Sequence, residues 1–99
     1  MQYLVIGRDG DDAGAPARRA AARAAHLEHA SVATQEGKLL FATAMLNDAG
    51  TMIGSVMVFD FASREELDAW LAQEPYVLGK VWESIEVRRA AVGRAFLAR

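Results

Sequence analysis

The sequence of 99 residues predicts a single α+β domain whose elements follow the order strand, helix, strand, strand, helix, strand. This prediction depends on an alanine-rich helical segment near the start, a hairpin pattern in the middle, and alternating apolar residues late in the chain. In this order, four antiparallel strands form one sheet and two helices pack on one of its faces, which is the ferredoxin-like arrangement. Residues 1–99 are therefore read as one domain, with 89–99 as a C-terminal extension.

The first strand is expected at residues 3–7, before a loop at 8–14 that is rich in aspartate and glycine. Pro16 fits the first turn of a helix and Gly37 is a natural stop, so a helix is expected between them. Spacings of three and four residues predict the buried stripe of this helix as Ala20, Ala24, Leu27, Ser31 and Thr34. Such small side chains would let the helix lie close to the sheet.

The rest of the chain is predicted to contain a hairpin, a second helix and a final strand. The remaining strands are expected at 38–46, 52–61 and 81–88. Ser63 and Glu66 form a capping box for the second helix, which must end before Pro75. The buried residues of that helix are predicted to be Leu67, Trp70 and Leu71.

The predicted strands are apolar on both faces, as in the first strand, where Leu4 and Ile6 alternate with Tyr3 and Val5. Two helices cover only one face, so a lone domain would leave the other apolar face in water. Burying about 800 Å² per partner outweighs ordinary association costs. We therefore expect a homodimer joined sheet to sheet. The apolar residues of the extension, Val92, Phe96 and Leu97, are candidates for a further contact with the partner chain.

Composition argues against several classes of protein. Thirteen acidic and eleven basic side chains are scattered along the chain, so no basic surface for nucleic acid is expected. No apolar run approaches the roughly 20 residues of a membrane span, and no signal segment is recognisable. There is no cysteine, which suits the cytoplasm. His26 and His29 have a spacing that could bind a metal, but no further ligand completes a site, so neither metal nor cofactor is expected.

His26 is the main candidate for chemistry in the first helix. It lies one position from Leu27, at the edge of the predicted stripe, where a histidine can be half-buried and still exchange protons near neutral pH. Arg19 and Arg23 lie on the same side and could hold an anion. The alternatives are a structural histidine and a solvated basic face. His29 is expected to be solvated.

Two further segments could contribute to a site. Pro75 disfavours helical geometry at Glu74, so the segment 74–76 could direct the Glu74 carboxylate and the Tyr76 phenol into a cleft. The alternative is a helix stop with Tyr76 packed over the core. The dipeptide at 54–55 permits either a close approach of the backbone to a ligand or a bulge. Ser55 lacks a Ser-His-Asp context and is not proposed as a nucleophile.

Four short motifs together resemble the YciI-like (YCII-related) family. They are Arg-x-x-His-Leu at 23–27, Glu-Gly-Lys-Leu-Leu at 36–40, Gly-Ser at 54–55 and Glu-Pro-Tyr at 74–76. The resemblance covers residues 1–88 and implies the dimeric α/β-barrel form of the ferredoxin-like fold. It also implies a cleft lined by His26, Glu74, Pro75 and Tyr76, with Arg23 and Ser55 as neighbours.

One branch of that family is similar to a dehydrochlorinase that acts on chlorinated hydroxymuconate, which implies acid/base elimination. The sequence departs from the family in two places. Glu74 stands where aspartate is usual, and residues 42–44 replace a Gly-Pro step. The leading hypothesis is a homodimeric enzyme in which His26, oriented by Glu74, moves a proton on a small anionic organic molecule held by Arg23 and the Tyr76 hydroxyl. The rival is a non-catalytic dimeric domain for ligand binding or stress response.

Overall fold

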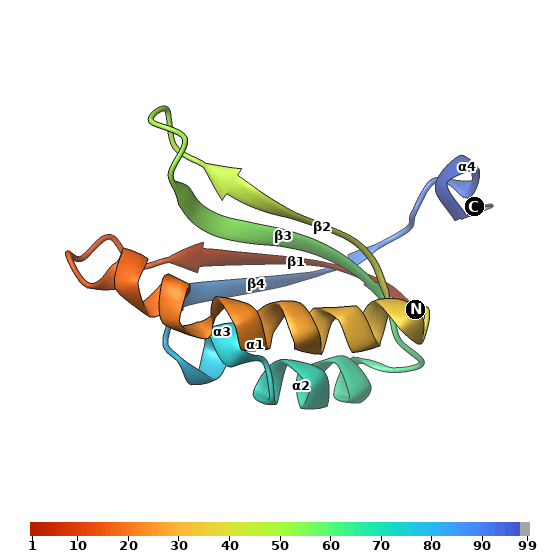
Figure 1. Cartoon of the computed structure of the whole chain (residues 1–99). Coiled ribbons are helices and arrows are strands. Elements are labelled where there is room, and N and C mark those ends of the chain that lie inside the picture. Colours follow the sequence, from red (N-terminus) through yellow and green to blue (C-terminus); the bar gives the residue numbers. More distant parts are fainter. Residues whose placement is uncertain (98–99) are drawn as a thin grey trace.

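The computed structural model describes residues 1–97, and Figure 1 shows the arrangement of its elements. The elements are β1 (Gln2–Asp9), α1 (Ala15–Gln35), β2 (Leu39–Leu46), β3 (Met52–Asp60), α2 (Arg64–Ala72), α3 (Pro75–Leu78), β4 (Trp82–Ala90) and α4 (Arg94–Leu97). The predicted order of four strands and two main helices is confirmed. The one-turn helices α3 and α4 were not predicted, because a single turn has too few residues to show a helical period.

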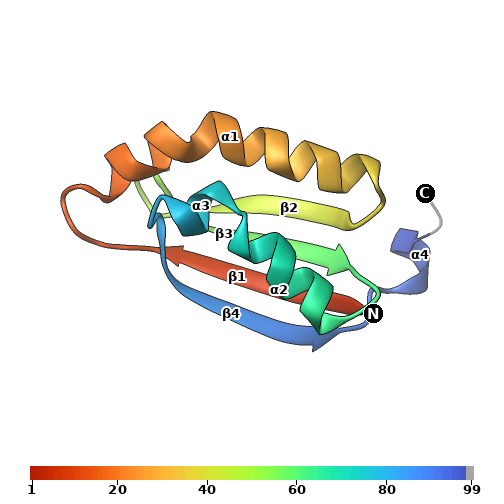
Figure 2. The same ribbon diagram turned by 90° about the horizontal axis from the view of Figure 1, so that it is seen from below.

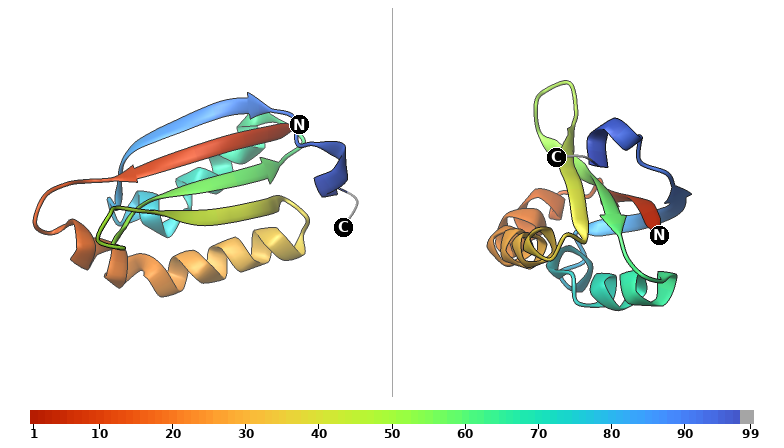
Figure 3. Two further views of the ribbon diagram at one scale, coloured as in Figure 1. Left: turned by 90° about the horizontal axis from the view of Figure 1, so that it is seen from above. Right: turned by 90° about the vertical axis from the view of Figure 1, so that its right-hand side faces the viewer.

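The four strands form one antiparallel sheet in the order β2-β3-β1-β4. Both main helices lie on the same face of this sheet, as the view from below shows (Figure 2). This is the predicted ferredoxin-like arrangement. The end-on view shows α4 on the side of the sheet away from α1 and α2 (Figure 3).

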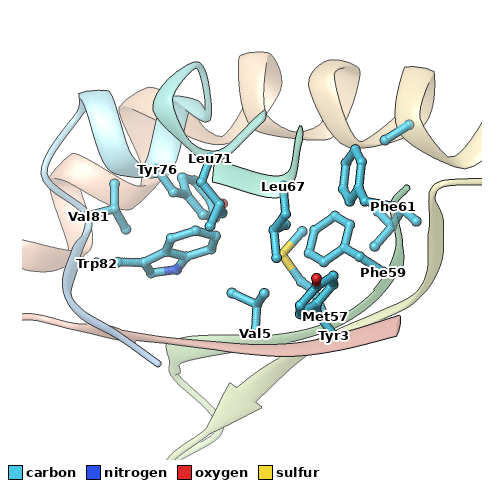
Figure 4. Close-up of a cluster of buried hydrophobic side chains, with 12 residues drawn as sticks. Tyr3, Val5, Met57, Phe59, Phe61, Leu67, Leu71, Tyr76, Val81 and Trp82 are labelled. Atoms are coloured by element: carbon cyan, nitrogen blue, oxygen red, sulfur yellow. The ribbon is translucent and has the colours of Figure 1, made fainter. Parts of the chain in front are cut away.

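The hydrophobic core lies between the sheet and the two helices (Figure 4). In the sheet, Tyr3 pairs with Phe59 and Val5 pairs with Met57, so these four side chains share the covered face. Leu67 and Leu71 of α2 pack on them, as predicted, and Trp70 is partly buried at the edge of the same cluster. Burying each large apolar side chain contributes about 1.5–3 kcal/mol.

Local signals define the ends of the two main helices. The Ser63 hydroxyl accepts a hydrogen bond from the Glu66 N–H at 3.2 Å, which caps α2 as expected. Gly37 follows α1 with a φ of 75°, a left-handed conformation that glycine adopts without strain. Both helices are therefore bounded by residues whose chemistry stops or starts a helix.

The buried face of α1 differs from the predicted stripe, which is wrong. Leu27 is 52% exposed, and the other four stripe residues are exposed as well. The inward-facing residues are Ala15, Arg19, Ala22, His26, Ala30 and Ala33. The prediction failed because it assumed an apolar face, whereas this helix turns an arginine and a histidine inward, where other segments supply partners. His26 is thus central to the buried face and not at its edge.

Apart from the one-turn helix α4, no helix among the described residues lies on the other face of the sheet. Leu4, Ile6, Val56 and Val58 lie on it in neighbouring register positions and are half-buried within one chain. Beside them on β2, Phe41 is 58% exposed. Sheet-to-sheet pairing through this open face stays a prediction. No helix among residues 1–97 is long and apolar enough to cross a membrane.

Just beyond the end of β4, the extension is hydrogen-bonded to β1. The Val92 N–H donates to the Gln2 side-chain oxygen at 2.6 Å, which sets the direction of the chain beyond the strand. Phe96 and Leu97 of α4 are largely exposed within one chain. The predicted contact of these residues with a partner chain remains a prediction.

Candidate functional site

A cleft of about 270 Å³ opens between α1 and the strands β2 and β3. Its walls combine two arginines, a histidine, hydroxyl groups, and small or apolar side chains. The lining residues are Arg19, Arg23, His26, Leu27, Ala42, Thr43, Ala44, Met52, Ser55, Met57 and Tyr76. The predicted site residues among them are Arg23, His26, Ser55 and Tyr76. Glu74 and Pro75 do not line the cleft.

His26 and Glu74 form a buried pair at the inner end of this cleft. The His26 Nδ1 atom lies 2.5 Å from Glu74 Oε1, although the two residues are 48 positions apart in the chain. The His26 Nε2 atom has no hydrogen-bond partner among residues 1–97, and it is not a fully buried atom. The ring is therefore held through one nitrogen while its other nitrogen remains accessible from the cleft. A histidine in this arrangement can pass a proton to or from a bound molecule.

Glu74 contacts His26 but does not line the cleft. Its side chain is fully buried, and Oε1 also accepts a hydrogen bond from the Tyr76 N–H at 3.1 Å. Oε2 has no partner among the described residues. Pro75 begins α3, and the extended backbone of Glu74 (φ −68°, ψ 122°) agrees with the constraint that a following proline imposes. Glu74 can orient His26, but it cannot touch a ligand in the cleft without rearrangement.

Two aromatic rings hold the imidazole in place. The Tyr76 ring stacks on His26 with a centroid distance of 3.8 Å and an interplanar angle of 7°. Trp82 meets His26 edge-on at 6.2 Å and Tyr76 edge-on at 5.6 Å. Figure 4 shows Tyr76 and Trp82 side by side within the core. The imidazole ring is therefore fixed by packing as well as by its contact with Glu74.

Arg19 belongs to the site, and its role there was not predicted from the sequence. It is only 7% exposed, and its Nε donates to Asp9 Oδ2 at 2.8 Å. Its other nitrogens donate to the Gly54 carbonyl at 2.8 Å, to Ser55 Oγ at 3.0 Å and to the Tyr76 hydroxyl at 3.3 Å. The spacing of Arg19 from Arg23 suggested a shared basic face, but Asp9 compensates the charge of Arg19. No signal in the sequence linked Asp9 to Arg19.

Arg23 differs from Arg19 in exposure and in partners. It is exposed on α1, and it has no ion pair or hydrogen bond within residues 1–97. Because Asp9 neutralises Arg19, the uncompensated positive charge among the described lining residues comes from Arg23. An anionic group in the cleft would therefore be attracted mainly by Arg23.

Gly54 and Ser55 lie in β3 below the cleft. Of the two readings, the bulge is supported by the strand pairing beside Gly54, and the backbone of the protein itself also approaches this glycine closely. A Cβ atom here would lie 2.7 Å from the Gly7 carbonyl oxygen and still closer to Met45. The pairing of β2 with β3 shifts register next to this position, between Met45 and Leu46. Ser55 is buried and accepts hydrogen bonds from both Arg19 and the Trp82 indole.

His29 takes no part in the cleft. Its ring stacks on Trp70 with a centroid distance of 4.3 Å, and its Nε2 lies 3.2 Å from the Trp70 carbonyl oxygen. The prediction that His29 is solvated is therefore wrong, because it is half-buried between α1 and α2. Within the described residues, no three histidine, aspartate or glutamate side chains lie close enough together to hold a metal ion.

An exposed ion pair fixes the loop that precedes α1. Arg18 donates to both carboxylate oxygens of Asp12, at 2.7 and 2.8 Å, and also to the Lys80 carbonyl at 3.1 Å. The hydrogen bond from Arg18 lowers the pKa of Asp12 to about 2. These contacts tie the first loop to the start of β4, away from the cleft.

Comparison with known sequences gives two consistent findings. Residues 1–91 match the YCII-related domain family. Protein YciI of Escherichia coli O6:H1 is 33% identical over 94 residues, covering 89% of this chain and 94% of that protein. Protein YciI of Shigella flexneri gives the same values. The last described residues of the extension lie outside the family match.

Comparison with solved structures confirms the fold. 5-Chloro-2-hydroxyhydroquinone dehydrochlorinase (TftG) from Burkholderia phenoliruptrix AC1100, solved with 2,5-dihydroxybenzoquinone, superposes with a TM-score of 0.81. It is 21% identical, over 96% of this chain and 98% of that one. Rv0793 from Mycobacterium tuberculosis has a TM-score of 0.58 and 16% identity, over 95% and 99% of the two chains. At these identities the likeness concerns the fold alone.

Proposed function

The chain belongs to the YCII-related domain family, and we propose that it is a small homodimeric enzyme in which His26 moves a proton on a small anionic organic molecule. The contact between His26 Nδ1 and Glu74 Oε1 carries this proposal. A carboxylate held against one ring nitrogen fixes the orientation of the imidazole. The other nitrogen is then the proton acceptor that faces the cleft.

The reaction class that we propose is acid/base elimination, as in a lyase or dehydrochlorinase. His26 Nε2 takes a proton from the substrate, the electron pair of that bond forms a double bond, and chloride leaves with the electrons of the carbon–chlorine bond. Arg23 attracts the anionic group, and the Ser55 and Tyr76 hydroxyls contact the bound molecule. Pro75 positions the segment 74–76. The named activity of TftG supports this class, although its likeness in fold does not transfer a substrate.

The protein is proposed to act as a dimer in the cytoplasm. The apolar open face of the sheet supports sheet-to-sheet pairing, since such a face is costly to leave in water. The lack of cysteine supports a reducing compartment.

Turnover of a substrate panel tests the enzymatic proposal. Chlorinated hydroxyhydroquinones and chlorinated hydroxymuconates would be incubated with the protein, and chloride release and ultraviolet absorbance would be followed. We expect His26→Ala to lower the rate about 100–10,000-fold, the range for loss of a general acid or base. His29→Ala is the matched control on the same helix and should leave the rate unchanged. Equal rates for His26→Ala and the unsubstituted protein would overturn the proposal.

The second candidate is a non-catalytic dimeric ligand-binding or stress-associated domain. It is favoured by Glu74, which is one methylene longer than the aspartate usual in the family, since proton transfer tolerates little displacement. The probe for this alternative is 2,5-dihydroxybenzoquinone, the molecule held by TftG. Binding of the probe, with no panel member consumed and with affinity unchanged in His26→Ala, would favour the binding domain over the enzyme.

A further inference from the structure

We propose that Ser55 serves the cleft only as a hydrogen-bond donor, so the bound molecule must place an acceptor oxygen, a carbonyl or an oxyanion, against it. This inference rests on the proposed function in one respect, namely that the cleft between α1 and β3 is the ligand site. It goes further by assigning the direction of one hydroxyl and the chemistry of the group that meets it.

The assignment follows from counting the hydrogen-bonding positions of the Ser55 hydroxyl. A serine oxygen has two lone pairs and one hydrogen. Arg19 Nη2 donates to Ser55 Oγ at 3.0 Å, and the Trp82 Nε1–H donates to the same oxygen at 3.3 Å. Guanidinium and indole N–H groups are donors that cannot accept. Both lone pairs of Ser55 are therefore engaged, and its hydrogen cannot point toward either partner.

The hydrogen has only one remaining direction. No acceptor for the Ser55 hydroxyl hydrogen lies within residues 1–97, and Ser55 lines the cleft. A buried donor without a partner is unfavourable unless water or a ligand accepts it. The geometry thus directs the hydrogen into the cleft, where an acceptor oxygen can satisfy it.

Neither of the two donors is free to turn away. Arg19 is held by Asp9 and by the Gly54 carbonyl, and it is itself buried. Trp82 is 6% exposed and packs edge-on against Tyr76. Arg19 is in this sense a positioning residue, because it acts on a ligand through the hydroxyl that it orients.

Arg19 imposes the same polarity on Tyr76. Its Nη1 donates to the Tyr76 hydroxyl at 3.3 Å, so the phenolic hydrogen must point elsewhere. Tyr76 and Ser55 both line the cleft, so their two hydroxyl hydrogens can meet the same ligand oxygen, and only Ser55 has both lone pairs engaged. Such a pair fits an oxygen that carries or develops negative charge. The same arrangement makes Ser55 a poor nucleophile, because its lone pairs are occupied.

Neutron diffraction on deuterium-exchanged crystals tests the assignment without any ligand. We expect nuclear density for a deuterium on Ser55 Oγ that points into the cleft, and density for deuterium on Arg19 Nη2 and on Trp82 Nε1 along the two hydrogen bonds. A Ser55 deuterium that points toward β1 or a backbone carbonyl would overturn the proposal. This result does not depend on whether the protein is an enzyme.

Binding of 2,5-dihydroxybenzoquinone, whose oxygens are acceptors, gives an independent test by calorimetry. Ser55→Ala should weaken binding about tenfold, corresponding to one hydrogen bond to a charged oxygen. Ser31→Ala, a matched control on the exposed side of α1 and outside the cleft lining, should change affinity less than about twofold. Equal affinity of Ser55→Ala and the unsubstituted protein would contradict the donor role. Failure of the unsubstituted protein to bind would count against the proposed function, and the neutron measurement would still decide the donor assignment.

A second variant guards against misfolding of Ser55→Ala. Trp82→Phe removes one of the two donors and allows the Ser55 hydroxyl to turn, so we expect a smaller loss of affinity, about twofold to threefold. A loss in Trp82→Phe that exceeds the loss in Ser55→Ala would contradict the orienting role assigned to the indole.

Discussion

The two faces of the sheet differ in how far the side chains on them find partners or burial within one chain. On the face covered by α1 and α2, even the buried charged groups have partners from the same chain, as in the pair of Arg19 with Asp9. On the open face, the central side chains are apolar and only half-buried within one chain, as at Val58, while the side toward β4 carries the ion pairs of Glu86 with Arg8 and Arg88. The covered face can therefore form a complete cleft in a single protomer. In the proposed dimer the open face is completed by a partner, so the cleft and the dimer should be separable by substitution.

The largest effect is expected from a substitution that breaks the polar network on the covered face. Arg19→Met keeps the length of the side chain but leaves Asp9 buried without its partner, which typically costs about 3–5 kcal/mol. The free energy of unfolding, measured by urea denaturation, should fall by that amount. Arg23→Met is the matched control on the same helix. Because Arg23 is exposed, its substitution should change the free energy of unfolding by less than about 0.5 kcal/mol. Equal effects of the two substitutions would contradict the distinction drawn between them.

The next effect concerns the open face. Val58→Glu places a charge at the centre of the apolar face, between Leu4 and Phe41 in the sheet. In a sheet-to-sheet dimer two such charges would be buried together, so the dissociation constant should rise at least about 100-fold. Sedimentation velocity measures this change. Ala20→Glu, on the exposed side of α1, is the control. A stable monomer before substitution, or an intact dimer after it, would remove the sheet-to-sheet dimer.

A smaller effect is expected from filling the cleft. Ala44 lines the wall opposite His26, and a leucine there would occupy part of the 270 Å³ volume. Binding of 2,5-dihydroxybenzoquinone should weaken about tenfold or more, since an overpacked site typically costs about 1–3 kcal/mol. The dimer should persist, because the cleft and the open face are on opposite sides of the sheet. Unchanged affinity in Ala44→Leu would indicate that the probe binds elsewhere.

The smallest effect on stability is expected from the ion pair of Asp12 with Arg18, which lies outside both faces. The pKa of Asp12 in the folded protein is lowered from 3.8 to about 2 by the hydrogen bond from Arg18. The stabilisation from this pair is therefore complete above pH 3.8 and is lost as the pH falls through 2. It is small, because the pair is exposed. Carboxyl NMR titration should find the lowered pKa, and Arg18→Gln should return it toward 3.8. An unchanged value in Arg18→Gln would contradict this cause.

The sequence predicted the fold well because each strand and main helix has a strong local signal. The apolar strands, the hairpin turn and the Ser63 cap each specify structure within a few residues. The helix face was predicted wrongly for a reason that concerns function. Apolar periodicity takes Arg19 for a surface residue, yet its partners come from β1, β3 and α3. A buried charge is satisfied by contacts distant in sequence, and no local pattern contains them.

The candidate site was predicted in part for the same reason. The motif at 23–27 and the segment at 74–76 both led to the cleft region, and the resemblance to a family connected them. That Glu74 stands behind His26 and does not face the cleft required the fold, because α3 is a single turn whose direction the sequence does not specify. The different roles of Arg19 and Arg23 likewise could not be predicted without knowing the position of Asp9.

The contact between His26 and Glu74 also ties the site to the folding of the whole chain. His26 comes from α1 and Glu74 directly precedes α3, and the hairpin and α2 lie between them in sequence. Closing so long a loop is entropically unfavourable until the intervening elements have packed. The dyad should therefore form late, and it should have no local opening of its own. Native-state hydrogen exchange at the Tyr76 amide, which is bonded to Glu74, should accordingly require unfolding of the entire domain.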